Sequence, residues 1–262
     1  MQEENMKSLA KTFDILELFL EGYNNLSVTE ISKILNLNKT TVSRILSKLT
    51  KRGYLRQVEK RGKFVLGTIF IKYGETVRQQ FVVRQVAMPF LSELSRLVKE
   101  FVIVSIWDRR EYVETEMFYD QSPNESRLQI IPGAGTSLPL YCTCLGKIML
   151  ADMSEDEFTA YFQKNPLKKH TQKTILDIAC IKKQMVDIRR EGVAMDDEET
   201  DIGIRGIASG IKDISGKIIG SIGILAPSSR QSCNQMLEFA PVLKEYADKI
   251  SRQLGYNAHT PL

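Results

Sequence analysis

Long apolar runs and abundant cysteines are both missing from this chain. No segment approaches the roughly 20 apolar residues that a membrane-spanning helix requires, and the longest candidate, residues 101–107, has the length of a buried strand. Only four cysteines and two histidines occur among 262 residues. Four cysteines in a chain of this length do not form a disulfide framework. A reducing cytoplasm is therefore the expected location, and no membrane partner is expected.

The common motifs of catalysis and cofactor binding are also missing. Gly146-Lys147 lacks both the upstream glycine of a phosphate-binding loop and the Ser or Thr that follows its lysine. No Gly-x-Ser-x-Gly nucleophile elbow occurs. Cys142 and Cys144 have no second cysteine pair, and neither histidine has a ligand-spaced partner, so no metal and no cofactor are predicted. An enzyme such as a small hydrolase would need a nucleophile–base pair, and it stays the weaker alternative.

Positive charge is concentrated in one part of the chain. Ten Lys and Arg stand against two acids between Glu30 and Leu66, a net of +8. Because the whole chain carries +4, the remainder carries about −4. A basic module joined to a mildly acidic remainder favours a polyanionic partner for the first part. Charge alone also allows a solvated basic face.

Helical periodicity begins close to the N-terminus. Residues 7–20 place apolar side chains at helical spacing: Leu9, Phe13, Leu16 and Leu20. Ser27 and Glu30 then form a capping-box pattern, in which the serine caps the next helix and the glutamate reaches back. That helix is expected to bury Ile31, Ile34 and Leu35. Asn36 ends it, since asparagine tolerates the left-handed conformation of a tight turn.

The third predicted helix has one apolar and one polar face. It follows Asn38, the expected N-cap, ends at Gly53, and carries an apolar stripe of Val42, Ile45, Leu46 and Leu49. Hydrogen-bond donors on the opposite face suit base edges and phosphates in a DNA major groove. These candidate DNA-binding residues are Lys39, Thr40, Thr41, Ser43, Arg44, Ser47 and Lys48.

A basic hairpin is predicted next, from strand-like segments at 54–58 and 63–66. Its candidate DNA contacts, to phosphates and the minor groove, are Lys60, Arg61 and Lys63. Helix, helix, turn, helix and basic hairpin is the order of a winged helix-turn-helix. The alternative is a protein-interaction module, which the clustered donors and basic tip disfavour. Double-stranded DNA is the predicted partner, and a module of this size usually binds a two-fold site as a dimer.

The rest of the chain mixes helical and strand periodicity. Helices are predicted at 68–80, 84–99, 155–163, 175–190 and 232–254, and another is predicted to run from the 138–147 segment to Leu150. The 84–99 helix has Pro89 in its first turns and an inner face of Val86, Phe90, Leu94 and Leu97. Strand candidates are 101–107, 112–118, 128–131 and a closing hairpin of 205–213 with 217–226. This pattern indicates an α+β domain.

Several segments, taken together and in order, resemble the IclR family of bacterial transcription regulators along nearly the full chain. They are Thr40-Thr41-Val42-Ser43-Arg44-Ile45-Leu46, Gly53-Tyr54-Leu55, Phe64-Val65-Leu66-Gly67, Leu138-Pro139-Leu140, Leu145-Gly146-Lys147, Thr171 with Thr174-Ile175, 192–199 and 203–208. The resemblance implies a winged helix-turn-helix domain at 1–67, a linker helix at 68–83 and a GAF-like effector-binding domain at 84–262. It also implies a homodimer or a dimer of dimers, and a small effector that is often a carboxylate.

The resemblance further implies where the effector binds. Its pocket would involve Ile130, Cys144, Leu145, Asp196, Ile204, Gly206, Gly223 and Leu225. Gly206 stands where many family members have cysteine, while Gly223 and Leu225 stand where some members have serine. The pocket is therefore expected to hold fewer donors and to be more apolar. Either an effector other than the small keto acids, or an unused pocket, would fit these departures.

Two features of the C-terminal domain leave alternatives open. Gly146 lies where the chain enters a helix, and the free N–H groups and dipole of a helix start favour a carboxylate. The alternative is that Gly146 only permits close packing. The run Asp196-Asp197-Glu198-Glu199 could be a metal site or an acid/base cluster, but a solvated loop is more common. Asp196 is also a candidate to hydrogen-bond an effector hydroxyl.

The resulting hypothesis is a sequence-specific DNA-binding regulator, a repressor by family habit, controlled by a small effector that is possibly an organic acid. The first alternative is a constitutive DNA-binding regulator with a vestigial pocket.

Overall fold

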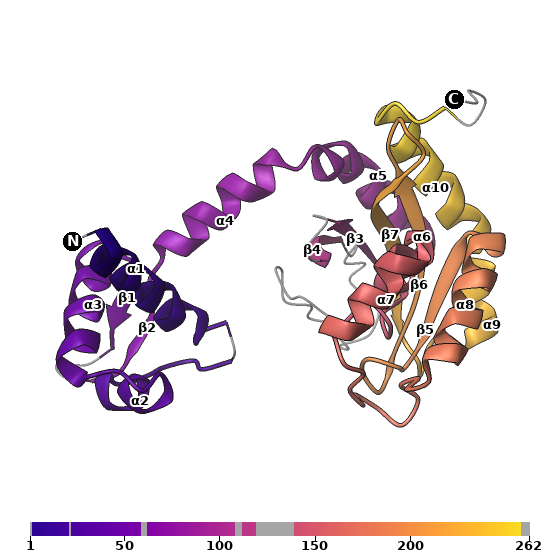
Figure 1. Ribbon diagram of the computed structural model, residues 1–262. Coiled ribbons are helices and arrows are strands. Elements are labelled where there is room, and N and C mark those ends of the chain that lie inside the picture. The colour runs from indigo at the N-terminus through magenta and orange to yellow at the C-terminus, as the bar shows by residue number, and fades with distance from the viewer. Residues whose placement is uncertain (1, 21, 59–61, 108–111, 119–138, 258–262) are drawn as a thin grey trace. The chain divides into compact units, whose positions relative to one another are not determined.

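The computed structural model describes residues 2–20, 22–58, 62–107, 112–118 and 139–257. The chain divides into two compact units, Met1–Arg78 and Gln79–Leu262, and each is considered by itself (Figure 1). Among the described residues, no helix is both long and apolar enough to cross a bilayer.

The N-terminal unit is a winged helix-turn-helix, as predicted. Its elements are α1 (Gln2–Glu17), α2 (Val28–Ile34), α3 (Lys39–Lys51), β1 (Leu55–Gln57), β2 (Phe64–Leu66) and most of α4 (Ile69–Gln80). The antiparallel pair β1–β2 has Leu55 opposite Leu66, and Leu26 bridges to Phe64. A single core joins α1, α2, α3 and the hairpin. The hairpin is therefore fixed against the helices by apolar packing.

Local signals set the ends of these helices. The capping box predicted at Ser27 and Glu30 is present in both directions. Asn36 takes the left-handed conformation, with φ of 50°, and Gly53 follows α3 with φ of 79°. Asn38 is the N-cap residue of α3, but its side chain makes no capping hydrogen bond. The turns were therefore predicted correctly, apart from the role of the Asn38 amide.

The buried faces of α1 and α2 differ from the prediction. The core residues here are Ile15 of α1 and Leu18 just after it, whereas Leu9 and Phe13 of α1 and Leu20 after it are 51%, 53% and 81% exposed. On α2 only Ile31 is buried, and Ile34 is 44% exposed. Helical spacing identifies a stripe, but the position of the neighbouring helices decides which side of it becomes core.

The C-terminal unit is built on one antiparallel sheet with the strand order β4-β3-β7-β6-β5. Its strands are β3 (Phe101–Trp107), β4 (Tyr112–Phe118), β5 (Val193–Asp197), β6 (Ile204–Lys212) and β7 (Ile218–Pro227). Its helices are α5 (Val82–Val98), α6 (Cys144–Asp152), α7 (Glu155–Lys164), α8 (Ile178–Glu191), α9 (Cys233–Glu238) and α10 (Ala240–Gln253). The α+β class is as predicted.

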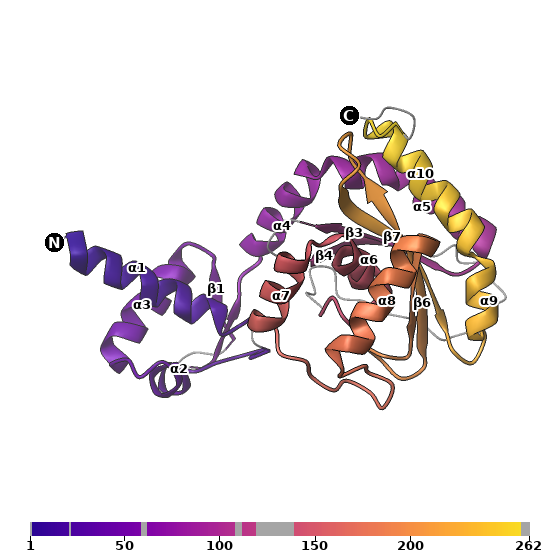
Figure 2. The same ribbon diagram turned by 45° about the vertical axis from the view of Figure 1, so that its right-hand side comes forward.

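Helices cover both faces of this sheet (Figure 2). Val102, Val104 and Ile106 of β3 point toward α5 and α10, in one apolar core. Ile103 points the other way, into a second core with α6, α7 and α8. Side chains alternate along a strand, so a fully buried strand needs apolar residues at every position. The run 101–107 is apolar at every position except Ser105, whose buried hydroxyl lies 2.7 Å from that of Ser221.

Several boundaries in this unit differ from the prediction. The strand β5 was not predicted, α8 begins at Ile178 rather than Ile175, and the last helix is divided at Phe239 into α9 and α10. Pro89 lies inside α5 rather than in its first turns, and Leu97 is 61% exposed instead of facing the core. The predicted strand 128–131 and the turn after it lie outside the described residues.

Candidate nucleic-acid interface and sensor site

The helix α3 presents a polar face because its apolar face is anchored. Val42, Ile45, Leu46 and Leu49 are all buried in the N-terminal core. Six of the predicted DNA-binding residues on α3 are exposed, namely Lys39, Thr40, Ser43, Arg44, Ser47 and Lys48, and Thr41 is half-buried. A fixed helix with donors directed to solvent has the chemistry of a major-groove reader.

A hollow of about 630 Å³ lies beside this face. It is lined by the start of α2, one side of α3 and the hairpin, through Ser27, Val28, Thr29, Ser43, Ser47, Thr50, Lys51, Gln57, Gly62 and Phe64. Among the described residues, none offers the buried Thr50 hydroxyl a hydrogen-bond partner. Thr50 and Lys51 were not among the residues predicted from the sequence, although Thr50 continues the Ser43 and Ser47 side of the helix.

Of the three basic hairpin residues predicted to contact DNA, Lys63 is the one that the structure describes. Lys63 is exposed and its ammonium lies 3.4 Å from a Glu30 carboxylate oxygen. Hydrogen bonds from Ser27, with a smaller influence of Lys63, hold the pKa of Glu30 below its usual value. Lys63 would therefore have to leave its exposed ion pair with Glu30 in order to bind a phosphate. Lys60 and Arg61 lie outside the described residues.

The first turn of α4 packs on the N-terminal unit. The Tyr54 ring meets Phe70 edge-on at 5.6 Å and stacks on Tyr73 at 6.1 Å. The hydroxyl groups of Tyr54 and Tyr73 lie 2.9 Å apart. Close backbone contact adds to this, since a Cβ on Gly67 would lie 1.9 Å from the Gly53 carbonyl oxygen. The start of α4 is therefore packed against this unit.

In the C-terminal unit the structure brings most of the predicted effector residues together. Gly206 of β6 lies opposite Leu225 of β7 and Asp196 of β5, on the sheet face that α6 covers. A Cβ on Gly206 would lie 2.6 Å from the Cys144 sulfur and 2.7 Å from Leu225 Cδ2. A Cβ on Gly223 would lie 3.0 Å from Leu145 Cδ2. The chain's own side chains thus fill the space over both glycines.

Ile204 and Gly146 are placed differently from that group, and Ile130 lies outside the described residues. Ile204 begins β6 and is half-buried. The Gly146 N–H donates to the Thr143 side chain at 3.0 Å, which caps α6. A Cβ on Gly146 would lie 2.5 Å from the Leu140 Cα. Of the two alternatives for Gly146, these contacts favour close packing, because its N–H already donates to Thr143.

The acidic run is not the solvated loop that was favoured. Asp196 and Asp197 belong to β5. The side chains of Asp196 and Glu199 are buried, and each residue is 6% exposed. Asp197 and Glu198 instead lie near the surface, where both pair with Lys173, and Asp197 also pairs with Arg205. Burial works against these contacts, yet hydrogen bonds from Arg205 and Lys173 lower the pKa of Asp197 to about 2. The two outer residues of the run are thus buried, and the two inner residues lie near the surface.

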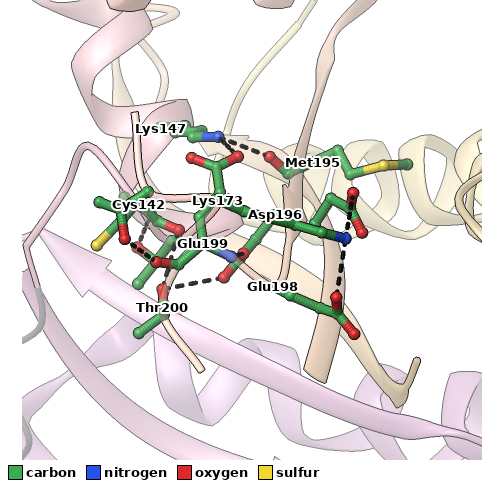
Figure 3. A network of polar contacts seen from close by, with 12 residues as sticks. Cys142, Lys147, Lys173, Met195, Asp196, Glu198, Glu199 and Thr200 are labelled. Atoms are coloured by element: carbon green, nitrogen blue, oxygen red, sulfur yellow. Dashed lines mark hydrogen bonds and ion pairs between the residues drawn. The ribbon is translucent and has the colours of Figure 1, made fainter. Parts of the chain in front are cut away.

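Asp196 is the centre of a buried polar network (Figure 3). One of its oxygens accepts the Glu199 N–H at 2.7 Å, and the other lies 3.0 Å from the Thr200 hydroxyl. The same hydroxyl lies 2.9 Å from the Cys142 carbonyl oxygen. Burial raises the pKa of Asp196 to about 7, despite the hydrogen bond from Glu199 and the nearby Lys147 charge. At neutral pH this group is divided between acid and carboxylate.

Lys147 and Glu199 form a buried ion pair next to Asp196 (Figure 3). Their side chains are 1% and 7% exposed. Lys147 also donates to the Met195 carbonyl at 2.9 Å. Burial raises the pKa of Glu199, with Lys147 opposing that shift. The Lys147 cation is thus already bound within the protein, and sequence reasoning missed this because partner and lysine are 52 positions apart.

A recognition helix with a hairpin, joined to an α+β unit with a polar site beneath α6, defines a DNA-binding transcription regulator with two domains. The family model for the bacterial transcriptional regulator IclR C-terminal domain matches residues 75–252, and that for the IclR helix-turn-helix domain matches residues 8–59. The chain therefore belongs to the IclR family.

Relatives and solved structures agree over nearly the whole chain. The chain is 29% identical to the HTH-type transcriptional regulator XynR of Escherichia coli, over 97% of this chain and 99% of that protein. It is 24% identical to the transcriptional repressor IclR of Escherichia coli, over 95% and 90%. The crystal structure of the Thermotoga maritima IclR matches with a TM-score of 0.72 at 29% identity, over 96% and 100%. The chain is thus similar to DNA-binding regulators throughout.

Proposed function

We propose that this regulator binds a two-fold operator as a dimer or a dimer of dimers, reads bases with α3, and changes its DNA affinity when a small effector binds the C-terminal unit. The observation that carries the proposal is the exposed donor face of α3 above a buried apolar stripe. The proposal includes no catalytic role. It places the protein in the cytoplasm, where its DNA would be.

Arg44 is the residue to which we assign base recognition. It is exposed at the centre of the polar face of α3, with hydroxyl groups of Thr40, Ser43 and Ser47 around it. An arginine reads guanine through two parallel hydrogen bonds from its planar guanidinium group to O6 and N7. Lys39 and Lys48 at the two ends of the face would bind phosphates.

The hollow beside α3 supports a second kind of contact. Its lining of hydroxyl groups, with Lys51 at one side, suits a backbone phosphate rather than a base edge. The buried Thr50 hydroxyl without a partner would then gain an acceptor. Phosphate contacts of this kind position the helix without selecting a sequence.

Fluorescence anisotropy on a duplex from upstream of the chain's own gene tests the DNA assignment, with a scrambled duplex as reference and a salt series for both. Arg44→Ala should lose roughly 1–3 kcal/mol of binding to the specific duplex and almost nothing on the scrambled one. Lys51→Gln should weaken both duplexes and reduce the salt slope by about 1. Arg252→Ala removes the same charge from α10 and should change neither. Unaltered specificity of Arg44→Ala would overturn the assignment of α3.

Control by an effector, with repression as its outcome, is the finer part of the proposal. Repression is supported by relatives that are transcriptional repressors, among them IclR and AllR of Escherichia coli. The effector class we propose is an organic acid or a hydroxylated compound that hydrogen-bonds Asp196. Cys144, Leu145 and Leu225 would form apolar walls, and Lys147 would stay with Glu199.

A constitutive regulator is the second candidate, because side chains of Cys144 and Leu145 already occupy the space over Gly206 and Gly223. A hydrolase has less support, since burial raises the pKa of the Cys142 thiol to about 11. Thermal unfolding with a panel of organic acids separates the first two. An effector at 100 times its Kd adds about 2.7 kcal/mol to the unfolding free energy. No stabilisation by any member of the panel, together with specific operator binding, would favour the constitutive regulator.

A further inference from the structure

We propose that Asp196, Thr200 and the Cys142 carbonyl form a proton-linked hydrogen-bond relay, and that this relay makes the entrance of α6 sensitive to pH near neutrality. The inference goes beyond DNA binding and effector control. It concerns residues that no catalytic or metal role accounts for. Figure 3 shows the three groups in sequence, with Thr200 between the carboxyl and the carbonyl.

The number of available protons decides the state of the relay. The Thr200 oxygen lies 2.9 Å from the Cys142 carbonyl oxygen and 3.0 Å from Asp196 Oδ2. A hydroxyl group has one proton, whereas a carbonyl and a carboxylate can only accept. One of the two contacts therefore has no proton while Asp196 is ionised. As the acid, Asp196 donates to Thr200, and Thr200 donates to Cys142.

The remaining oxygen of Asp196 is satisfied in both states. Asp196 Oδ1 accepts the Glu199 N–H at 2.7 Å. The relay is thus complete in the acid form and lacks one hydrogen bond in the ionised form. An unpaired buried acceptor is destabilising, so Thr200 has to leave either the carboxylate or the carbonyl.

The Cys142 carbonyl is well placed to transmit this change. It belongs to a fully buried residue immediately before Thr143, the N-cap of α6. Thr143 in turn accepts the Gly146 N–H. When Thr200 turns to the ionised carboxylate, the chain segment that enters α6 loses the hydrogen bond from Thr200 to the Cys142 carbonyl. That segment also carries Cys144 and Leu145, which cover the glycines of β6 and β7.

Charged and titratable groups around Asp196 place its titration near neutral pH. Lys147 faces it from α6, Glu199 from the segment after β5, and Cys142 from the segment before α6. Lys147 and Glu199 are paired with each other, so their charges partly cancel. The Cys142 thiol, with its pKa raised by burial to about 11, stays neutral. Desolvation is then the main influence on Asp196, and it favours the acid.

Amide hydrogen exchange of the full-length protein between pH 5.5 and 8.5 tests the relay. Opening of the α6 entrance releases the carboxyl proton, because an exposed aspartate has a pKa of about 3.9. After correction for intrinsic exchange, protection of peptides from 139–152 should fall about tenfold between pH 6 and pH 8 and then level off. Peptides from α10 should not follow this curve.

Matched variants separate the relay from a general effect of burial. Asp196→Asn can donate to Thr200 at every pH, so protection should stay high and flat. Thr200→Ser should keep the wild-type curve, while Thr200→Val should leave the α6 entrance poorly protected even at pH 6. Asp197→Asn changes the neighbouring surface carboxyl and should leave the pH response intact. Direct titration of the Asp196 carboxyl by carbon NMR of the wild-type protein supports the relay if it titrates between pH 6 and pH 8. Absence of that titration, or a titration with constant protection of 139–152, would overturn it.

Discussion

Removal of the Lys147 charge provides the sharpest test of how the C-terminal unit is held together. The Lys147–Glu199 pair is almost completely buried. Lys147 donates to Glu199 Oε1, and Oε2 has no hydrogen-bond partner among the described residues. Lys147→Met preserves the length of the side chain but leaves a carboxylate without its cation and the Met195 carbonyl without its donor. Breaking a buried pair in this way costs about 3–5 kcal/mol. That is a large share of the roughly 5–15 kcal/mol that stabilises a typical domain.

Urea unfolding, followed by the single tryptophan and by circular dichroism, measures this loss. The double variant Lys147→Met with Glu199→Gln removes the buried charge, so it should recover at least about 1–2 kcal/mol relative to Lys147→Met alone. Lys182→Met is the matched control, because its pair with Glu155 is exposed and should contribute less than about 1 kcal/mol. Acid pH should reduce the defect of Lys147→Met, since protonation neutralises Glu199. A single variant as stable as the control would refute this account of the pair.

Four further predictions concern separate parts of the chain. Gly206→Ala should destabilise by about 1–3 kcal/mol through overpacking against Cys144, and Cys144→Ala in the same chain should restore part of it; equal urea midpoints for wild type and Gly206→Ala would contradict the packing. Arg230→Leu should cost about 1.5–3 kcal/mol by leaving the buried Glu100 carboxylate with fewer donors, measured against Arg252→Leu on α10. Ser27→Ala should cost about 1 kcal/mol of N-terminal unit stability through loss of the cap, while exposed Thr29→Ala should stay near wild type. Because the pKa of Asp196 is raised, this group stabilises the folded protein at acid pH, and the contribution is lost as pH rises to about 7. Over that range the unfolding free energy of the wild type should fall by up to about 1.4 kcal/mol per pH unit relative to Asp196→Asn.

The comparison of sequence and structure shows which signals are local. The capping box at Ser27 was visible because every atom involved lies within four residues. The apolar stripe of α3 and the buried run of β3 were visible for a similar reason, since periodicity is a property of one segment. Leu9 and Phe13 misled the prediction because a helix with apolar residues on more than one side needs its neighbours to select a face.

Some residues of the candidate site can likewise be predicted from local sequence, and others only from the tertiary structure. The donors of α3 follow from their spacing, and the structure places them on an exposed face. The strand β5 was missed because four consecutive acids are typical of a solvated segment. Lys147, far away in the sequence, and the fold around Asp196 make burial of Asp196 and Glu199 possible. A partner supplied by tertiary structure gives no periodic signal.

The strand order has a consequence for synthesis on the ribosome. The central strands β3 and β7 pair with each other. The buried hydroxyl groups of Ser105 and Ser221, which are 116 residues apart in the sequence, lie 2.7 Å from each other. The emerging chain therefore carries β3 and α5 with unprotected apolar surface until β7 has been translated. The DNA-binding unit completes its hairpin at Leu66 and can fold much earlier. A nascent chain would thus hold a finished recognition helix before the sheet of the C-terminal unit can close.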